Sequence, residues 1–237
     1  ARDIMRVVFA GPSIWGINYD HLRGVDLRPP AQRGDILRAL HEGAEAIAII
    51  DGLFGNCPSI GHKEILFALS RRVPVIGGAS MGALRAAECH VFGMIGIGGI
   101  YRDYADGTLV SDSDVAVLHA PAEFNFKPMT SALVDIEATL TKVRRTIGID
   151  TCELVLNAAK VLHFSERSWD KIVEFAGLNC ELSVKLLHHT VERKQTDAIE
   201  TLKALRCNIP QKTAPNFNAT ESFMVDIEQY RPDLANS

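Results

Sequence analysis

The sequence lacks both the long apolar run of a membrane protein and the positive charge of a nucleic-acid-binding protein. No uninterrupted apolar stretch approaches the roughly 18–20 residues that a membrane-spanning helix needs. The 237 residues carry a formal net charge of −4, whereas nucleic-acid surfaces are built from an excess of Lys and Arg. We therefore expect neither a membrane nor a nucleic acid as the main partner.

Cysteine is scarce, and its spacing does not suggest pairing. The five cysteines are odd in number and contain no C-x-x-C pair: Cys57, Cys89, Cys152, Cys180 and Cys207. This pattern favours reduced thiols over a disulfide framework or a zinc site. No apolar secretory segment precedes the first strand pattern. We expect a cytoplasmic protein without a metal or cofactor, and the role of Cys57 stays open.

The stretch around which the chain is organised is 73–90, with the sequence VPVIGGASMGALRAAECH. An apolar β-branched run, a small-residue turn and a helix-favouring segment follow one another there. Ser80 lies between Gly78 and Gly82 in the G-x-S-x-G spacing of a nucleophile elbow. At a helix N-terminus, free N–H groups stabilise developing negative charge. The alternative is that Ser80 only caps the helix.

Strand and helix patterns alternate through the first third of the chain. We predict strands at 4–10, 44–50 and 73–76, with helices at 31–43 and 62–70 and another from Met81. This alternation indicates a parallel sheet covered by helices. Sites in such sheets lie beyond the carboxyl ends of the strands. The loops at 11–13, 51–63 and 77–80 should therefore converge.

The pattern changes beyond His90. We expect a glycine-rich loop at 92–104 and a further strand at 115–119. The predicted helices are 131–147, 152–164, 168–177, 180–206 and 221–230, with 180–206 as a solvated or partner-facing surface. The predicted fold is α/β, with an N-terminal parallel-sheet, Rossmann-like core followed by a mostly helical C-terminal half. We place the boundary between 1–148 and 149–237, with the helical region packed on the core.

Lys63 is the strongest companion for Ser80. It would lie in the first turn of the helix after the second strand, and a desolvated, near-neutral lysine can accept a serine proton. A lysine at a helix start is more often solvated. Asp51 closes the second strand and could orient Lys63 or bind a metal, although an Asp-Gly turn with Gly52 is the commoner explanation.

Further candidates surround this pair. The Met81 N–H follows the nucleophile and is a candidate oxyanion donor, with a second donor from the loop of Gly11 or of Gly52. Ser13, His62 and Arg85 complete the substrate-binding candidates. For His62 the alternative is a packing or surface histidine. For Arg85 it is an ordinary helix-surface pair with Glu88.

Several segments together resemble the TfuA family, and the similarity covers about residues 4–145. They are 10–13 (AGPS), 51–54 (DGLF), Pro58 with 62–66 (HKEIL), 78–88 (GASMGALRAAE), 92–94 (FGM), Gly96, Gly98, Tyr104, Gly107, 114–117 (DVAV) and His119. The block from Lys63 to Glu88 is far more specific than an isolated G-x-S-x-G.

The resemblance implies a function in backbone thioamidation alongside a YcaO enzyme. TfuA-like proteins are understood to hydrolyse the C-terminal thiocarboxylate of a ThiS-like, ubiquitin-fold sulfur carrier through a Ser-Lys pair. The reaction releases sulfide for the YcaO. Family members are also understood to help the YcaO bind its peptide or protein substrate. Ser80 and Lys63 match that pair here.

Two other functions are compatible with the sequence. A non-catalytic adaptor could dock the YcaO, the carrier and the peptide, with Ser80 as a helix cap only. A generic serine hydrolase could act on small esters or amides, but the downstream Asp and His of an α/β-hydrolase are not evident.

Overall fold

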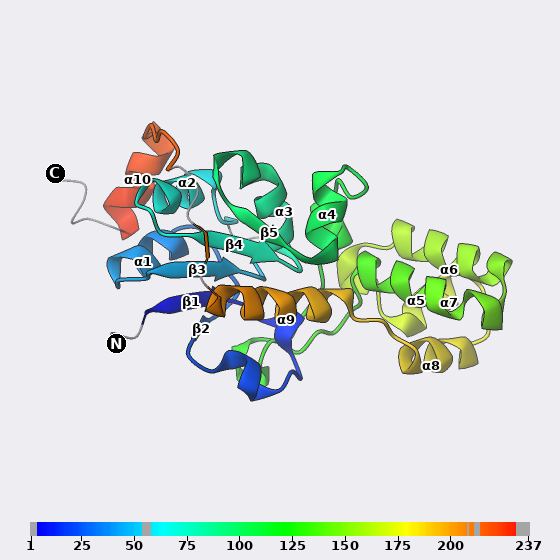
Figure 1. Cartoon of the computed structure of the whole chain (residues 1–237). Coiled ribbons are helices and arrows are strands. Elements are labelled where there is room, and N and C mark those ends of the chain that lie inside the picture. Colours follow the sequence, from blue (N-terminus) through cyan, green and yellow to red (C-terminus); the bar gives the residue numbers. More distant parts are fainter. Residues whose placement is uncertain (1–3, 54–57, 208, 211–213, 231–237) are drawn as a thin grey trace.

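A computed structural model describes residues 4–53, 58–207, 209–210 and 214–230. These residues form a five-stranded sheet in which every neighbouring pair is parallel (Figure 1). The strand order is β2-β1-β3-β4-β5. The strands are β1 (Arg6–Phe9), β2 (Asp26–Arg28), β3 (Ala46–Ile49), β4 (Val75–Gly78) and β5 (Ile95–Ile97). The predicted fold class, a parallel α/β core followed by helices, is confirmed.

The sequence predicted the three central strands and missed the two at the edges. β3 is a continuous apolar run, β1 is apolar after Arg6, and β4 begins with Val75 and Ile76, because parallel strands are covered on both faces. β2 contains Asp26 and Arg28, and β5 has a glycine at its centre, so neither carries a strand pattern. The strand predicted at 115–119 is wrong, since only an isolated bridge joins His119 to Pro128.

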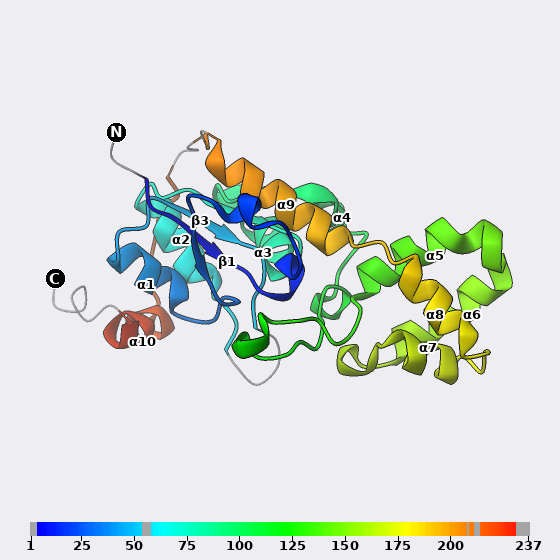
Figure 2. The same cartoon turned by 90° about the horizontal axis from the view of Figure 1, so that it is seen from below.

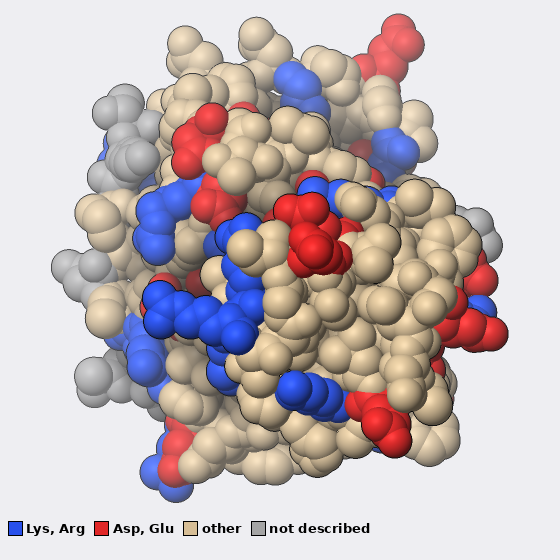
Figure 3. Space-filling view, turned by 90° about the vertical axis from the view of Figure 1, so that its right-hand side faces the viewer, with Lys and Arg blue, Asp and Glu red and all other residues tan. Residues whose placement is uncertain are grey.

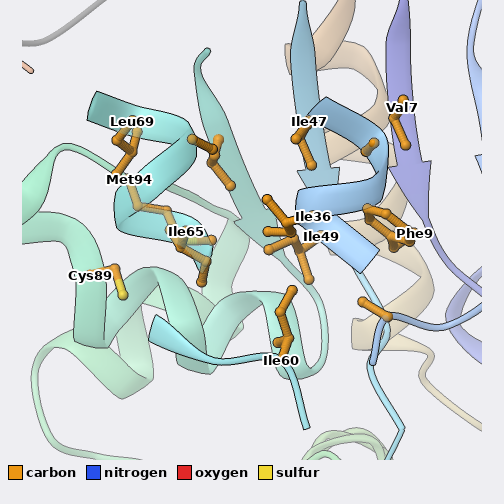
Figure 4. Packing of buried hydrophobic residues seen from close by; sticks show 14 of the residues in the cluster. Val7, Phe9, Ile36, Ile47, Ile49, Ile60, Ile65, Leu69, Cys89 and Met94 are labelled. Carbon is orange, nitrogen blue, oxygen red and sulfur yellow. The ribbon is translucent and has the colours of Figure 1, made fainter. Parts of the chain in front are cut away.

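Three helices cover one face of the sheet. They are α1 (Asp35–His41), α2 (His62–Ser70) and α3 (Met81–Cys89). Because side chains alternate along a strand, Val7, Phe9, Ile47 and Ile49 all point to this face. Figure 4 shows them packed with helix residues such as Ile36 and Ile65.

A helix from the C-terminal half covers the opposite face. α9 (Arg193–Arg206) runs along this face in both views (Figures 1 and 2). Its buried Ala198, Leu202 and Leu205 pack on the alternate strand residues, which include Val8 and Ala48. The single solvated helix predicted at 180–206 is therefore wrong. Two helices occupy this range instead. α8 (Glu181–His188) ends before α9 begins, and α9 buries its apolar stripe against the sheet.

Of the remaining helices, α5 to α8 form a separate module, α4 packs on α3, and α10 packs on α1 and α2. α4 (Gly98–Ala105) starts inside the segment predicted as a glycine-rich loop. α5 (Leu133–Ile147), α6 (Ile149–Val161), α7 (Trp169–Phe175) and α8 share a core that includes Ile136, Val155 and Leu186. Figure 3 looks onto this helical module, where Lys and Arg side chains gather along one side, Asp and Glu side chains form smaller groups, and the surface between them carries neither.

α10 (Glu221–Tyr230) packs its Phe223 and Ile227 against Leu37 of α1 and Phe67 of α2. Short 3-10 turns connect the elements: η1 (Pro12–Ile14), η2 (Tyr19–Leu22), η3 (His90–Phe92), η4 (Asp112–Asp114), η5 (Ala122–Phe124) and η6 (Phe164–Glu166). None of the helices in the described ranges combines the length and apolar character needed to cross a membrane.

The packing of α9 on the sheet makes a direct prediction for stability. Leu202 is fully buried between α9 and the strands, so Leu202→Ala should lower the free energy of unfolding by about 2–5 kcal/mol. The adjacent Lys203 is exposed, and Lys203→Ala should change it by less than about 0.5 kcal/mol. Urea unfolding of both variants checks the difference. Equal, small effects would contradict the packing.

Candidate active site

Asp51 joins the loops that follow β1 and β3. In this strand order the connection from β1 leads to one side of the sheet and the connection from β3 leads to the other side. Parallel α/β sheets form binding crevices at such a position. The buried Asp51 Oδ2 accepts the N–H groups of Gly11 at 2.8 Å and Ser13 at 3.0 Å. Its Oδ1 accepts the Ser13 hydroxyl at 2.6 Å. Asp51 therefore fixes the loop of Gly11 and Ser13 through both of its carboxylate oxygens.

Ser80 lies on the sharp turn between β4 and α3. The preceding Ala79 has a positive φ of 67°, which costs free energy for a residue with a Cβ. Glycine is required at Gly82, because a Cβ there would lie 1.8 Å from the Ile49 carbonyl oxygen. The Gly82 N–H donates to the Ile50 carbonyl at 3.2 Å. This close approach brings the third predicted loop to the same edge of the sheet.

The Ser80 hydroxyl does not cap its helix. Ser80 occupies the N-cap position of α3, yet its side chain makes no capping hydrogen bond. It is 1% exposed, and its Oγ donates instead to the Val115 carbonyl oxygen at 3.4 Å. The hydroxyl is therefore bonded to the segment that precedes α5 and not to the first turn of α3.

Lys63 lies in the first turn of α2, as the sequence predicted. Its Nζ donates to the Asn218 carbonyl at 2.8 Å and lies 5.6 Å from the centroid of the Phe217 ring. These partners belong to the segment before α10. Among the bonds of the described residues, none joins Lys63 to Ser80, so the predicted pair is not in contact here.

His62 and Arg85 meet on one carboxylate. The Glu88 Oε2 lies 2.8 Å from His62 Nε2 and accepts Arg85 Nη1 at 2.7 Å. Arg85 Nε also donates to the Ile60 carbonyl at 3.0 Å. This bridge ties the start of α2 to α3 at the surface. The i,i+3 pair of Arg85 and Glu88 is present, and a substrate-binding role for His62 and Arg85 stays a prediction.

The candidate oxyanion donors separate into two groups. The Gly11 N–H is already donated to Asp51. Gly52 lies directly against Met81, since a Cβ at Gly52 would be 2.7 Å from Met81 Cγ. Within the part of the chain that the structure describes, the N–H groups of Met81 and Gly52 have no hydrogen-bond partner. These two are the better candidates.

The sequence missed a buried lysine beside Ser80. Lys194 Nζ donates to the Val115 carbonyl at 2.7 Å, the same oxygen that accepts the Ser80 hydroxyl. Burial lowers the pKa of Lys194, and the charges of Asp51 and Asp135 partly oppose that shift. Burial raises the pKa of Asp135 to about 6. The available signal was a lysine in line with the apolar stripe of Ala198, Leu202 and Leu205 at helical spacing.

A small pocket of about 100 Å³ reaches this cluster, and Ser13, Asp135 and Lys194 are among its lining residues. In the described ranges, no group of three or more His, Cys, Asp or Glu side chains is arranged to hold a metal ion. Cys57 and Phe54 lie outside the described residues. The four described cysteines are free thiols.

The fold and site define a parallel α/β protein with a serine on a strand–turn–helix elbow at the carboxyl edge of its sheet. Residues 51–168, about half of the chain, match the model of the TfuA-like protein family. The chain belongs to this family, and membership implies a role alongside a YcaO enzyme in thioamidation. Lys63 and Ser80 lie inside the matched region, whereas Lys194 lies outside it.

Other comparisons add little. No curated protein matches the chain. Solved structures similar to it include the RcsB response regulator of Salmonella typhimurium, at 13% identity, covering 87% of this chain and 100% of that one. The TM-score of 0.25 carries no argument about fold or function.

Glu64, next to Lys63, is a buried carboxyl group with half of its hydrogen-bonding capacity unused. Its Oε1 accepts the Gly61 N–H at 3.4 Å, and its Oε2 has no hydrogen-bond partner among the residues that the structure describes. Burial raises the pKa of Glu64 from 4.5 to about 7. The protonated Glu64 side chain therefore stabilises the folded protein, and this stabilisation is complete below the pKa of the unfolded chain. The stabilisation is lost as the pH rises through the pKa of the folded protein.

We predict that Glu64→Gln removes this loss. Between pH 4.5 and about 7, wild-type stability should fall relative to the variant by up to about 1.4 kcal/mol per pH unit. Urea unfolding at pH 5 and pH 8 measures the change in the difference between the two proteins. The exposed Glu123→Gln is the control and should parallel the wild type. A constant difference between Glu64→Gln and wild type would contradict the prediction.

Proposed function

We propose that the protein is a hydrolase that releases sulfide from a thiocarboxylated ThiS-like carrier for its YcaO partner, with Ser80 as nucleophile. The observation that carries the proposal is the state of the Ser80 hydroxyl. It lies at a helix N-terminus on a strained turn and makes no capping bond. The carbonyl oxygen of Val115 that accepts it also accepts the amine of Lys194. Family membership supplies the YcaO partner.

The reaction is a two-step acyl transfer. A lysine accepts the Ser80 proton as Oγ bonds to the thiocarboxylate carbon. The carbon–sulfur bond then breaks, and the lysine returns the proton so that sulfur leaves as hydrosulfide. Water next attacks the acyl-enzyme ester, freeing the carrier carboxylate and the Ser80 hydroxyl. The N–H groups of Met81 and Gly52 are candidate donors to the tetrahedral oxyanion.

Two lysines are candidates for the proton acceptor. Lys63 is the residue that the family resemblance implies, and its assignment as base stays a prediction. Its amine is held by the Asn218 carbonyl, so it would have to leave that bond to reach Ser80. Lys194 already shares an acceptor with Ser80.

A larger pocket supports binding of an extended carrier tail near the site. Its volume is about 490 Å³, and Gly11, Trp15 and Phe126 are among its lining residues. Gly11 belongs to the loop that Asp51 fixes, which links the pocket to the carboxyl edge of the sheet.

A non-catalytic adaptor is the second candidate function. The helical module exposes large apolar side chains, which include Val161, Phe175 and Leu187. Exposed apolar side chains of this kind support docking of a protein partner. Charge reversals on the module would abolish thioamidation in this case, and Ser80→Ala would leave it intact.

Sulfide release from a thiocarboxylated ThiS-like carrier tests the proposal. Wild-type protein should release sulfide, and Ser80→Ala should be slower by at least about 1,000-fold because it removes the nucleophile. Ser165→Ala, in the helical module, should keep the wild-type rate. Lys63→Ala tests the base implied by the family. Stimulation of YcaO by a wild-type protein that releases no sulfide would favour the adaptor.

A further inference from the structure

α8 carries apolar side chains on its outer face as well as on its inner one. Leu186 is fully buried in the core of the helical module, whereas Val184 and Leu187 are 55% and 62% exposed. These two exposed side chains are three positions apart, so they are neighbours on the surface of the helix. A helix whose outer face meets only water usually carries polar side chains there. Val184 and Leu187 therefore form an apolar ridge on the surface of the module.

Cations lie beside this ridge. Lys185 follows Val184 on α8 and is exposed. On the neighbouring α5, the exposed Lys142 donates from its Nζ to the His189 carbonyl oxygen at the end of α8, at 3.3 Å. Arg145 is also exposed and lies one turn further along α5. Figure 3, which looks onto the module, shows Lys and Arg side chains gathered along one side of it.

These three cations keep their charge unpaired. The salt bridges that the structure describes within the module use other side chains. Among the described residues, no carboxylate lies within 4.0 Å of the cationic groups of Lys142, Arg145 or Lys185. Glu181 lies one turn before Lys185, in the first turn of α8, where a negative charge also stabilises the helix. An unpaired cationic stripe beside an apolar ridge is complementary to an acidic surface with an apolar centre.

We call the ridge and the stripe together the α5–α8 face: Lys142, Arg145, Val184, Lys185 and Leu187. This face leads to the candidate active site, because Thr190, two residues after α8, lines the small pocket of about 100 Å³. Trp15 lines that pocket and also the larger one, where we place the carrier tail. No residue of the α5–α8 face lines the larger pocket. A partner on the face and a carrier tail in the larger pocket could therefore be bound together.

We propose that the α5–α8 face docks the YcaO partner, which meets it with an acidic surface around an apolar centre. This inference deepens the proposed function and rests on it for the reason that the two proteins meet here. Hydrosulfide released at the site is lost to solvent unless its consumer is close, and docking beside the small pocket raises the local concentration of sulfide at the YcaO.

Two other occupants suit the face less well. The net charge of −4 disfavours a nucleic acid, whose binding depends on an excess of Lys and Arg. A second copy of the chain, related by a twofold axis, would bring the same patch of each copy together. The cationic stripes of the two copies would then approach each other, which is unfavourable.

Binding of the full chain to the purified YcaO enzyme, measured by titration calorimetry, tests the proposal. Leu187→Glu adds a negative charge to the ridge, and the double variant Arg145→Glu with Lys185→Glu reverses the stripe. Each should weaken binding by at least about tenfold. Raising the salt concentration from about 50 mM to about 300 mM should weaken binding of the wild type more than binding of the double variant.

Matched controls use side chains of the same kind elsewhere on the surface. Val161→Glu adds the same charge at an apolar side chain of α6 that is 71% exposed. Lys203→Glu reverses an exposed cation of α9. Both should bind the YcaO within about twofold of the wild type. Urea unfolding shows whether each variant is folded, and since all the changed side chains are exposed, all should unfold near the wild-type midpoint.

Wild-type affinity of Leu187→Glu and of the double variant would overturn the proposal. So would equal weakening of binding by Val161→Glu. A wild-type dimer that Leu187→Glu dissociates, with the affinity for the YcaO unchanged, would assign the face to a second copy instead. Binding of a single-stranded oligonucleotide that only the double variant loses, again with unchanged YcaO affinity, would assign the stripe to a nucleic acid.

The binding experiment contains no carrier, so its outcome is separate from that of the sulfide-release assay. A wild-type protein that binds the YcaO through this face but releases no sulfide would overturn the hydrolase and support the docking surface. A wild-type protein that releases sulfide, with unchanged YcaO affinity in both test variants, would overturn the docking surface and support the hydrolase.

Discussion

The packing of α9 across the second face of the sheet is the interaction on which the rest of the structure depends. Leu202 and Leu205 cover strands that would otherwise expose apolar side chains to water. The same helix brings Lys194 to the carbonyl oxygen that Ser80 uses. Stability and the proposed chemistry therefore share one interface, and a change that loosens α9 should affect both.

This packing places ionisable side chains in the interior of the protein. Asp51 and Lys194 are buried, and Asp135 is partly exposed at the small pocket. Burial of an ionised group is unfavourable unless its hydrogen bonds are replaced. Backbone N–H groups replace them for both carboxylates, and a single carbonyl does so for the amine. The lysine has the fewest replacement bonds of the three, and burial lowers its pKa.

Two lysines of different character lie on either side of the boundary of the family match, one inside it and one outside it. Lys63, inside the match, anchors the segment before α10, close to the surface bridge of His62, Arg85 and Glu88. Lys194, outside the match, lies in the interior beside Ser80. A family model that ends at residue 168 describes the nucleophile and its elbow, but it does not include the helix that completes the cluster.

The sequence by itself determined the three central strands, the elbow at Ser80 and the convergence of the loops near Asp51, because local apolar runs and glycine spacing encode them. It also carried the family resemblance. Tertiary structure alone decided the edge strands β2 and β5, which pair without an apolar pattern of their own. It also decided that α9 returns to the sheet. Lys194 meets Ser80 across 114 positions of sequence, and only the packing of α9 brings such distant residues together.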